Sequence, residues 1–484
     1  MAAAAESGED TSALARLAWT LGSSEPALRL LLSLLVGYPL AAIQRTLLFG
    51  CNPTFHHVFY TLTGLCLAYF NFGWGLVHPA ICVMLQWQLI HVLGPTAMLV
   101  AITLTFQMAY LLLGYYYTAT DGYDISWTMP QCVLALKLIG VAFDYYDGGK
   151  PKDKLTAEQA VMAVSQPPTC KELFSFTFFF GGFLVGPQFG LRRFRDLVCS
   201  RLTDQQGHPP RSLWPALKRL TLGMLYITVF AIASVRFPDN YLLSSDYQEQ
   251  PFWFRCMYIA LWGKFALCKY VSCWLIAEGV CILTGLGWTG TDASPGKQVN
   301  PKLGWASDGW DACSNVRILL FETTVHFTGK IVSFNTNTNS WAARYVFKRL
   351  RFLGSKLVSQ AVTLMFLAVW HGLHSGYFVC FSLELLIVFT ERKTLEFVDS
   401  IPKLKHVTSL RPVRFLLYPP LYLFQMMFLS YPLVPFCLFS WEKWLRVYSS
   451  VYFVGHLTFI VVLLVLPLLR VALPSSKHQR TKDD

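Results

Sequence analysis

Charged side chains are scarce in this sequence. Asp, Glu, Lys and Arg make up only 14% of the 484 residues, whereas hydrophobic residues make up 54% and aromatic residues 15%. An ordinary soluble domain contains about 25% charged residues. The deficit excludes a water-soluble globular protein. Many apolar stretches have the length of about 20 residues that a bilayer-spanning helix needs, so the sequence predicts an integral membrane protein.

Three familiar sequence signals are also missing. The N-terminal segment 1–26 has no basic stretch followed by an apolar run, so we expect it to be retained rather than cleaved as a signal peptide. The thirteen cysteines include no C-x-x-C pair, and no paired histidine spacing accompanies them, which predicts buried apolar thiols and no zinc site. No Asn-x-Ser/Thr acceptor with a permitted middle residue occurs, so glycosylation does not indicate an orientation. We expect neither a metal nor a bound cofactor.

The apolar segments predict an all-α, polytopic membrane protein with about nine to twelve transmembrane helices. They lie at residues 28–48, 55–72, 76–93, 97–117, 130–142, 173–185, 220–234, 252–274, 275–288, 318–331, 360–390, 417–439 and 451–471. Several are short or interrupted by Gly and Pro, and such segments usually line a cavity because free backbone groups cannot face lipid. We therefore expect one transmembrane domain, 27–474, around an internal chamber, followed by a charged tail at 475–484.

The scarce charge is unevenly distributed. Residues 323–383 contain no acidic residue but six basic ones, and 344–352 mixes bases with aromatic residues at helical spacing. This composition is typical of a helix lying in the headgroup layer, although an ordinary positive-inside anchor would have it too. A second basic connection, 192–219, has seven bases against two acids and is expected to face the cytoplasm.

If both basic stretches share that face, they would attract a polyanion such as a coenzyme A thioester. The candidate contacts are Arg344, Lys348, Arg349 and Arg351. The formal net charge of +12 does not indicate nucleic acid, because the bases lie beside membrane spans.

Two histidines, His371 and His374, lie within the apolar segment 360–390, which we expect to be one helix. Ionisable residues inside a membrane are functional candidates by default. A neutral imidazole can take a proton from a hydroxyl, so His371 is a candidate general base. The alternative is a histidine that only makes a hydrogen bond between helices. His374, three residues on, is expected on the same helix face, either supporting the site or simply packing.

Two motifs connect this segment to a known family. Residues 334–341, Phe-Asn-Thr-Asn-Thr-Asn-Ser-Trp, resemble the W-N-x-x-T-x-x-W signature of the membrane-bound O-acyltransferase (MBOAT) family, with Phe334 in place of the first Trp. Residues 370–377 resemble its W-H-G-x-x-P-G-Y motif, with Ser375 in place of Pro. Asn335 and His371 are 36 residues apart, similar to the family's Asn and His. Residues 180–189 and 264–287 also resemble family segments, so the resemblance covers nearly the whole chain.

The resemblance implies an acyl-CoA-dependent acyltransferase with His371 as the base and Asn335 assisting. It implies transfer of a fatty acyl group, with a preference for polyunsaturated chains, to the sn-2 hydroxyl of lysophosphatidylcholine. Lysophosphatidylethanolamine and lysophosphatidylserine are the further acceptors that it implies, and acyl-CoA is a co-substrate. Acylation of a peptide or a sterol, or a transporter without enzymatic activity, remain alternatives. The two halves of the sequence show no repeated order of broken segments, which argues against the transporter.

The intramembrane charges Lys264, Lys269 and Glu278 leave two alternatives. They pair with one another, or Glu278 faces the choline ammonium while a lysine faces the phosphate. With Trp341 and His374 they form the candidate acceptor site. Bases at the third and fifth positions from the C-terminus, Lys482 and Arg480, resemble a degraded endoplasmic reticulum return signal, so we expect that membrane, with a solvated basic tail as the alternative. The oligomeric state stays open, a homodimer being one option.

Overall fold

The computed structural model describes residues 12–120, 125–204, 206–290 and 309–472. Within these ranges the protein is helical and contains no β-strand, apart from an isolated bridge between Val316 and Phe334. The predicted all-α class is confirmed. The expected tail at 475–484, with Arg480 and Lys482, lies outside the described residues, as do residues 1–11 of the N-terminal segment.

Seven helical stretches among the described residues are long and apolar enough to cross a membrane. They are Glu25–Leu48, Pro53–Leu93, Ala97–Thr118, Leu213–Leu243, Phe252–Thr284, Arg411–Leu438 and Val454–Ala472. Pro53–Leu93 contains two of the predicted spans, α3 and α4, which meet at the 3₁₀ turn Gly73–Leu76. Shorter helices lie between these stretches, so the count is broadly consistent with the predicted range, and the protein is a multi-pass membrane protein.

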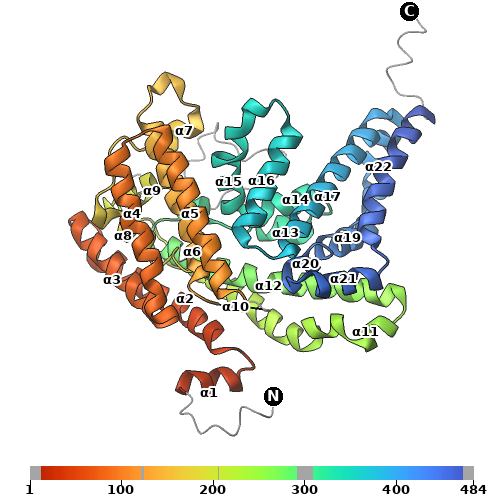
Figure 1. Ribbon diagram of the computed structural model, residues 1–484, viewed down its shortest axis with the longest axis horizontal. Helices are drawn as coiled ribbons and strands as arrows, with labels where there is room; N and C mark the ends of the chain where they lie inside the picture. Colours follow the sequence, from red (N-terminus) through yellow and green to blue (C-terminus); the bar gives the residue numbers. More distant parts are fainter. Residues whose placement is uncertain (1–11, 121–124, 205, 291–308, 473–484) are drawn as a thin grey trace, which may run out of the picture. The chain divides into compact units, whose positions relative to one another are not determined.

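The described residues form two compact units. The first lies within Met1–Gln107, Asp124–Thr221 and Cys273–Cys313, and the second within Met108–Tyr123, Leu222–Ser272 and Ser314–Asp484. The first unit contains α1 (Ala13–Thr20), α2 (Glu25–Ile43), α3 (Pro53–Phe72), α4 (Val77–Leu93), α6 (Thr128–Gly148), α7 (Ala157–Met162), α8 (Cys170–Thr177) and α9 (Leu191–Val198), with parts of α5 (Ala97–Thr118), α10 (Leu213–Arg236) and α12 (Phe252–Thr284). In it, α8 packs against α3 and α4 (Figure 1).

One predicted span of the first unit is wrong. The apolar segment 173–185 does not form a membrane-spanning helix, because α8 ends at Thr177 and the chain continues without helix to Gly190. Phe178 and Phe179 are nevertheless fully buried, and the Phe179 ring lies 5.0 Å from the Tyr60 ring of α3. The segment is an irregular apolar stretch held inside protein, the condition under which non-helical backbone is tolerated at membrane depth.

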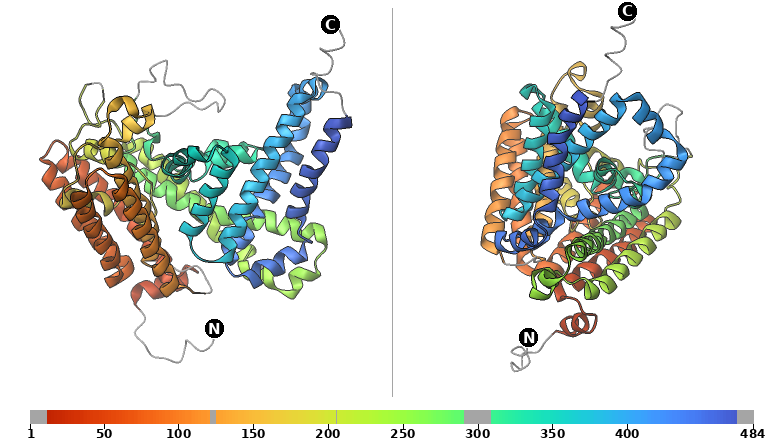
Figure 2. Two further views of the ribbon diagram at one scale, coloured as in Figure 1. Left: turned by 45° about the horizontal axis from the view of Figure 1, so that its top comes forward. Right: turned by 90° about the vertical axis from the view of Figure 1, so that its right-hand side faces the viewer.

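The second unit holds most of the C-terminal half. It contains α11 (Ser245–Glu249), α13 (Ile318–Thr323), α14 (Phe327–Ser333), α15 (Thr336–Tyr345), α16 (Lys356–His371), α17 (Ser375–Ser400), α18 (Pro402–Ser409), α19 (Arg411–Ser430), α20 (Leu433–Leu438), α21 (Trp441–Ser450) and α22 (Val454–Ala472), with parts of α5, α10 and α12. Figure 2 shows α17 and α22 running side by side.

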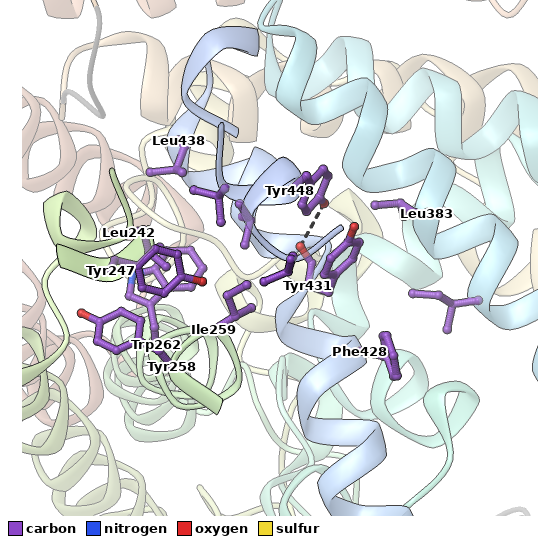
Figure 3. Close-up of a cluster of buried hydrophobic side chains, with 14 of the residues drawn as sticks. Leu242, Tyr247, Tyr258, Ile259, Trp262, Leu383, Phe428, Tyr431, Leu438 and Tyr448 are labelled. Carbon is purple, nitrogen blue, oxygen red and sulfur yellow. Dashed lines mark hydrogen bonds between the residues drawn. The ribbon is translucent and has the colours of Figure 1, made fainter. Parts of the chain in front are cut away.

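The core of the second unit is built from aromatic and branched side chains of α11, α12, α17 and α19 to α22 (Figure 3). Tyr431 and Tyr448 are fully buried, and their rings stack with centroids 4.3 Å apart. The Tyr448 hydroxyl donates a hydrogen bond of 3.0 Å to the Tyr431 carbonyl oxygen, so this buried polar group is satisfied. These contacts tie the last helices of the chain to α17.

Two further span boundaries differ from the prediction. Residues 252–274 and 275–288 were predicted as separate spans, but one helix of 33 residues, α12, covers residues 252–284 because no Pro interrupts it. Gly263 in this helix is closely packed against Ser430. Residues 318–331, predicted as one apolar segment, form two short helices, α13 and α14, which are separated by Thr324–His326.

Candidate active site

The histidine-bearing segment is two helices rather than one. We predicted a single span over 360–390, but α16 ends at His371 and α17 begins at Ser375. Gly372 caps α16 with a φ of +141°, a backbone conformation that residues with a Cβ rarely adopt. The break therefore comes from glycine, and it places His371 at the open end of a helix instead of in its middle.

The break also overturns the predicted position of His374. That residue is the N-cap of α17 and does not share a helix face with His371. Its ring lies 5.2 Å from the ring of Phe439. Ser375, which departs from the family's Pro, accepts a hydrogen bond of 3.1 Å from the Trp444 indole N–H, and its hydroxyl donates one of 3.4 Å to the Phe439 carbonyl. Phe439, which follows α20, and Trp444 of α21 thus contact the residues at the break between α16 and α17.

His371 lies in a box of aromatic rings. Its ring centroid is 5.1 Å from Phe381, 5.3 Å from Phe436 and 5.7 Å from Tyr377. Nδ1 lies 2.7 Å from the Leu367 carbonyl oxygen, one turn earlier in α16. Because a carbonyl oxygen can only accept a hydrogen bond, Nδ1 carries the proton in this arrangement. The lone pair is then on Nε2, which is the state that a general base requires.

Asn335 stands out from the polar residues around it. Thr336 donates its hydroxyl to the Ser314 carbonyl at 2.6 Å, and the Asn339 amide donates to the Phe334 carbonyl at 2.9 Å, so these side chains fix the start of α15. Asn335 has left-handed backbone angles, φ 49° and ψ 43°, and its amide has no hydrogen-bond partner among the described residues. Asn is one of the few residues that tolerate this conformation. Its half-buried amide is left for a ligand.

Helices α15 and α16 form a hairpin that brings Asn335 and His371 to the same end (Figure 1). Trp341 of α15 stacks on Phe366 of α16, with centroids 5.8 Å apart and an interplanar angle of 18°. Asn335 precedes Trp341 by six residues and His371 follows Phe366 by five. At 1.5 Å per residue, the two lie roughly 9 Å and 7.5 Å from this contact, in the same direction along the hairpin. The stacking also explains why Trp341, an acceptor-site candidate, is buried.

The four candidate coenzyme A contacts are at the opposite end of the hairpin. Arg344 is in α15, whereas Lys348, Arg349 and Arg351 are in the short 3₁₀ helix Phe347–Leu353 that leads to α16. The predicted continuous helix over 344–352 is wrong, because α15 ends at Tyr345 and the chain bends at Val346. Lys348 and Arg351 are exposed. The 16 residues of α16 make it about 24 Å long, and this length separates the basic turn from His371.

Two of the intramembrane charges of α12, Lys264 and Glu278, form ion pairs with residues of other helices. In the second unit Lys264 forms an ion pair with Glu322, whose carboxylate also accepts a hydrogen bond of 2.7 Å from the Tyr226 hydroxyl. In the first unit Glu278 pairs with Arg219 at 2.7 Å. Glu322 and Arg219 therefore offset the charges of Lys264 and Glu278. The predicted pairing among Lys264, Lys269 and Glu278 does not account for them. Lys269 lies with its ammonium 5.1 Å from the Tyr270 ring centroid.

Several residues of the site were not predicted. Phe436 belongs to α20 and Phe439 directly follows that helix, and no spacing rule connects these two residues to α16. Tyr377 belongs to the second motif, but its contact with the base could not be inferred while 360–390 was taken as one helix. Among the described residues no cluster of three or more His, Cys, Asp or Glu could hold a metal. The prediction that no cofactor is bound stays a prediction.

The comparison with protein families identifies the class of protein that carries this site. Residues 112–434 match the family described as MBOAT, membrane-bound O-acyltransferase family. The match covers both motifs, the hairpin and the break between α16 and α17. The chain therefore belongs to the membrane-bound O-acyltransferase family, a family of enzymes that transfer acyl groups, and the predicted family is confirmed.

The curated relatives resemble this chain along almost its whole length. Proteins named lysophospholipid acyltransferase 5 from Homo sapiens and Mus musculus are both 48% identical to it, over 100% and 98% of this chain and 97% and 95% of their own length. The protein of the same name from Drosophila melanogaster is 36% identical over 91% of this chain and 87% of its own.

Proposed function

We propose that this protein transfers a fatty acyl group from acyl-CoA to the hydroxyl of a lysophospholipid. The observation that carries the proposal is His371, whose Nδ1–H is held by the Leu367 carbonyl and whose Nε2 is the nitrogen left to accept a proton. The names and the 48% identity of the human and mouse relatives support a lysophospholipid as the acceptor. Acylation of a peptide or a sterol would use the same base and is the second candidate.

The reaction needs one nucleophilic attack and two proton transfers, both through His371. Nε2 of His371 takes the proton from the acceptor hydroxyl, whose oxygen attacks the thioester carbonyl carbon. The C–S bond then breaks, an ester forms, and the thiolate of coenzyme A takes the proton from the imidazolium. The Asn335 amide would donate a hydrogen bond to the carbonyl oxygen as negative charge develops on it. A thioester is already activated, so no covalent enzyme intermediate is required.

The basic turn would bind the charged end of acyl-CoA. Coenzyme A carries its phosphates far from its sulfur, and the hairpin likewise has Arg344, Lys348, Arg349 and Arg351 at one end and His371 at the other. Charge-assisted hydrogen bonds to phosphate suit arginine in particular. We propose acyl-CoA as the donor on this basis. We further propose lysophosphatidylcholine as the acceptor, with lysophosphatidylethanolamine and lysophosphatidylserine as additional acceptors. The proposed location of the protein is the endoplasmic reticulum membrane.

The acceptor and the base can be tested together. Purified protein in detergent is incubated with lysophosphatidylcholine and a polyunsaturated acyl-CoA, and the products are measured by lipid mass spectrometry. We expect phosphatidylcholine to form, and His371→Ala to slow its formation by about 10²- to 10⁴-fold, the usual contribution of a general base. His406→Ala is the matched control, because His406 is exposed on α18, which is outside the site.

Two outcomes would contradict the proposal. Full activity of His371→Ala would remove that residue as the base. Acyl groups found on a peptide or a sterol, with none on lysophospholipid, would overturn the acceptor class while leaving the base in place.

A further inference from the structure

Glu384 is a single carboxylate in the apolar part of α17. It is the only charged residue between Ser375 and Thr390, and no hydrogen bond or ion pair satisfies it among the residues that the structure describes. Its side chain is half-buried among the apolar residues of α17. An ionised carboxylate without a partner in such surroundings costs several kcal/mol. A cationic ligand would remove that cost.

The position of Glu384 on α17 places it beside the base. Tyr377, Phe381 and Glu384 follow at intervals of four and three residues, so they share one face of the helix. The rings of Tyr377 and Phe381 both contact the His371 ring. Glu384 is three residues beyond Phe381, roughly 4.5 Å further along the helix axis. The carboxylate therefore extends the aromatic wall of the site by about one turn.

A cation lies near this wall but does not neutralise Glu384. The Cys380 thiol interacts electrostatically with Glu384 and with the Cys437 thiol of α20. Cys437 in turn interacts with the ammonium of Lys269 from α12. Glu384 and Lys269 therefore each lie near one of these two thiols. A negative group and a positive group in one unit are complementary to a head group that contains both a phosphate and a positively charged nitrogen.

We propose that Glu384 binds the positively charged nitrogen of the acceptor head group and selects lysophospholipids that carry one. The inference rests on the proposed function. It assigns to Glu384 the contact with the choline ammonium that the sequence suggested for Glu278, because Glu278 is paired with Arg219. The ligand class is therefore a zwitterionic or choline-bearing lysophospholipid rather than one with an uncharged head.

The test compares two acceptors that differ in this nitrogen. Wild-type protein, Glu384→Gln and the control Glu396→Gln are assayed with lysophosphatidylcholine and with lysophosphatidylglycerol of the same acyl chain. The control removes an exposed carboxylate of α17 whose partner is Lys393. We expect Glu384→Gln to lower kcat/KM for lysophosphatidylcholine by about tenfold or more, to leave the value for lysophosphatidylglycerol unchanged or higher, and to leave the KM for acyl-CoA unchanged.

An equal loss with both acceptors, or no loss with either, would overturn the role of Glu384. Failure of the wild-type protein to acylate either lipid would instead refute the proposed function. In that case binding of the two lysophospholipids is measured without acyl-CoA. A weaker affinity of Glu384→Gln for lysophosphatidylcholine alone supports the head-group site, and equal affinities for wild type and variant overturn it.

Discussion

Glu278 and Glu384 are both carboxylates in the middle of apolar helices, and their surroundings differ completely. In the first unit Glu278 is 1% exposed and accepts a hydrogen bond of 2.7 Å from the Arg219 Nε–H. In the second unit Glu384 retains accessible surface, has no such partner among the described residues, and follows the rings that contact His371. A charge that the protein itself neutralises holds the fold together. We propose that a charge left unneutralised near His371 is available to a substrate.

The largest predicted effect is a loss of stability when the partner of Glu278 is removed. Arg219→Ala leaves the Glu278 carboxylate buried without its cation, which costs about 3–5 kcal/mol of unfolding free energy. The thermal unfolding temperature of the purified protein should fall steeply. Arg201→Ala is the control, because the Arg201 side chain is 69% exposed in its contact with Asp196 and should contribute little. An unchanged unfolding temperature in Arg219→Ala would show that the pair does not hold the first unit together.

A second effect of similar size is expected on catalysis alone. Asn335→Gly removes the amide but keeps the left-handed backbone, which glycine adopts without strain. We expect kcat to fall by about 10²- to 10³-fold, as for loss of an oxyanion donor, with little change in unfolding temperature. Alanine at this position would add backbone strain and confuse the two effects.

Asn339→Ala provides the contrast within the same turn. Its amide donates to the Ile331 and Phe334 carbonyls, so its loss should lower stability by about 1–3 kcal/mol. If Asn335→Gly instead lowers stability and leaves kcat intact, Asn335 stabilises the fold, as Asn339 does, and has no role in catalysis.

The smallest effect is expected at Ser375. It is the first residue of α17, a position that favours Pro, and the preceding His374 already has the extended backbone, φ −67° and ψ 135°, that a residue before Pro requires. Ser375→Pro should therefore fold and change the unfolding free energy by only about 1 kcal/mol, from loss of the Trp444 hydrogen bond. Unfolded Ser375→Pro protein would mean that the serine hydroxyl is essential to the break.

The family motifs were easier to identify from the sequence than the helix boundaries were, and the roles of their residues stay predictions. His371 and Asn335 were identified from motif residues, and both lie in the second unit at one end of the same hairpin. The single helix over 360–390 was wrong because apolar composition continues through Gly372, and only the backbone angle of that glycine ends α16. The division of α12 at residue 274 was also wrong, because the helix continues without interruption to Thr284, well beyond the about 20 residues that one span requires.

The sequence by itself determined the membrane environment and the all-α class, and it indicated Asn335 and His371 as candidates, because composition and short motifs are local properties of the chain. Only the tertiary structure decided which charges are neutralised. Arg219 and Glu278 are 59 residues apart, and Phe436 lies 65 residues beyond His371. Contacts at such separations depend on how helices pack, and one sequence carries no direct record of that packing. The partner of each buried charge, and hence whether it supports the fold or the reaction, became visible only in three dimensions.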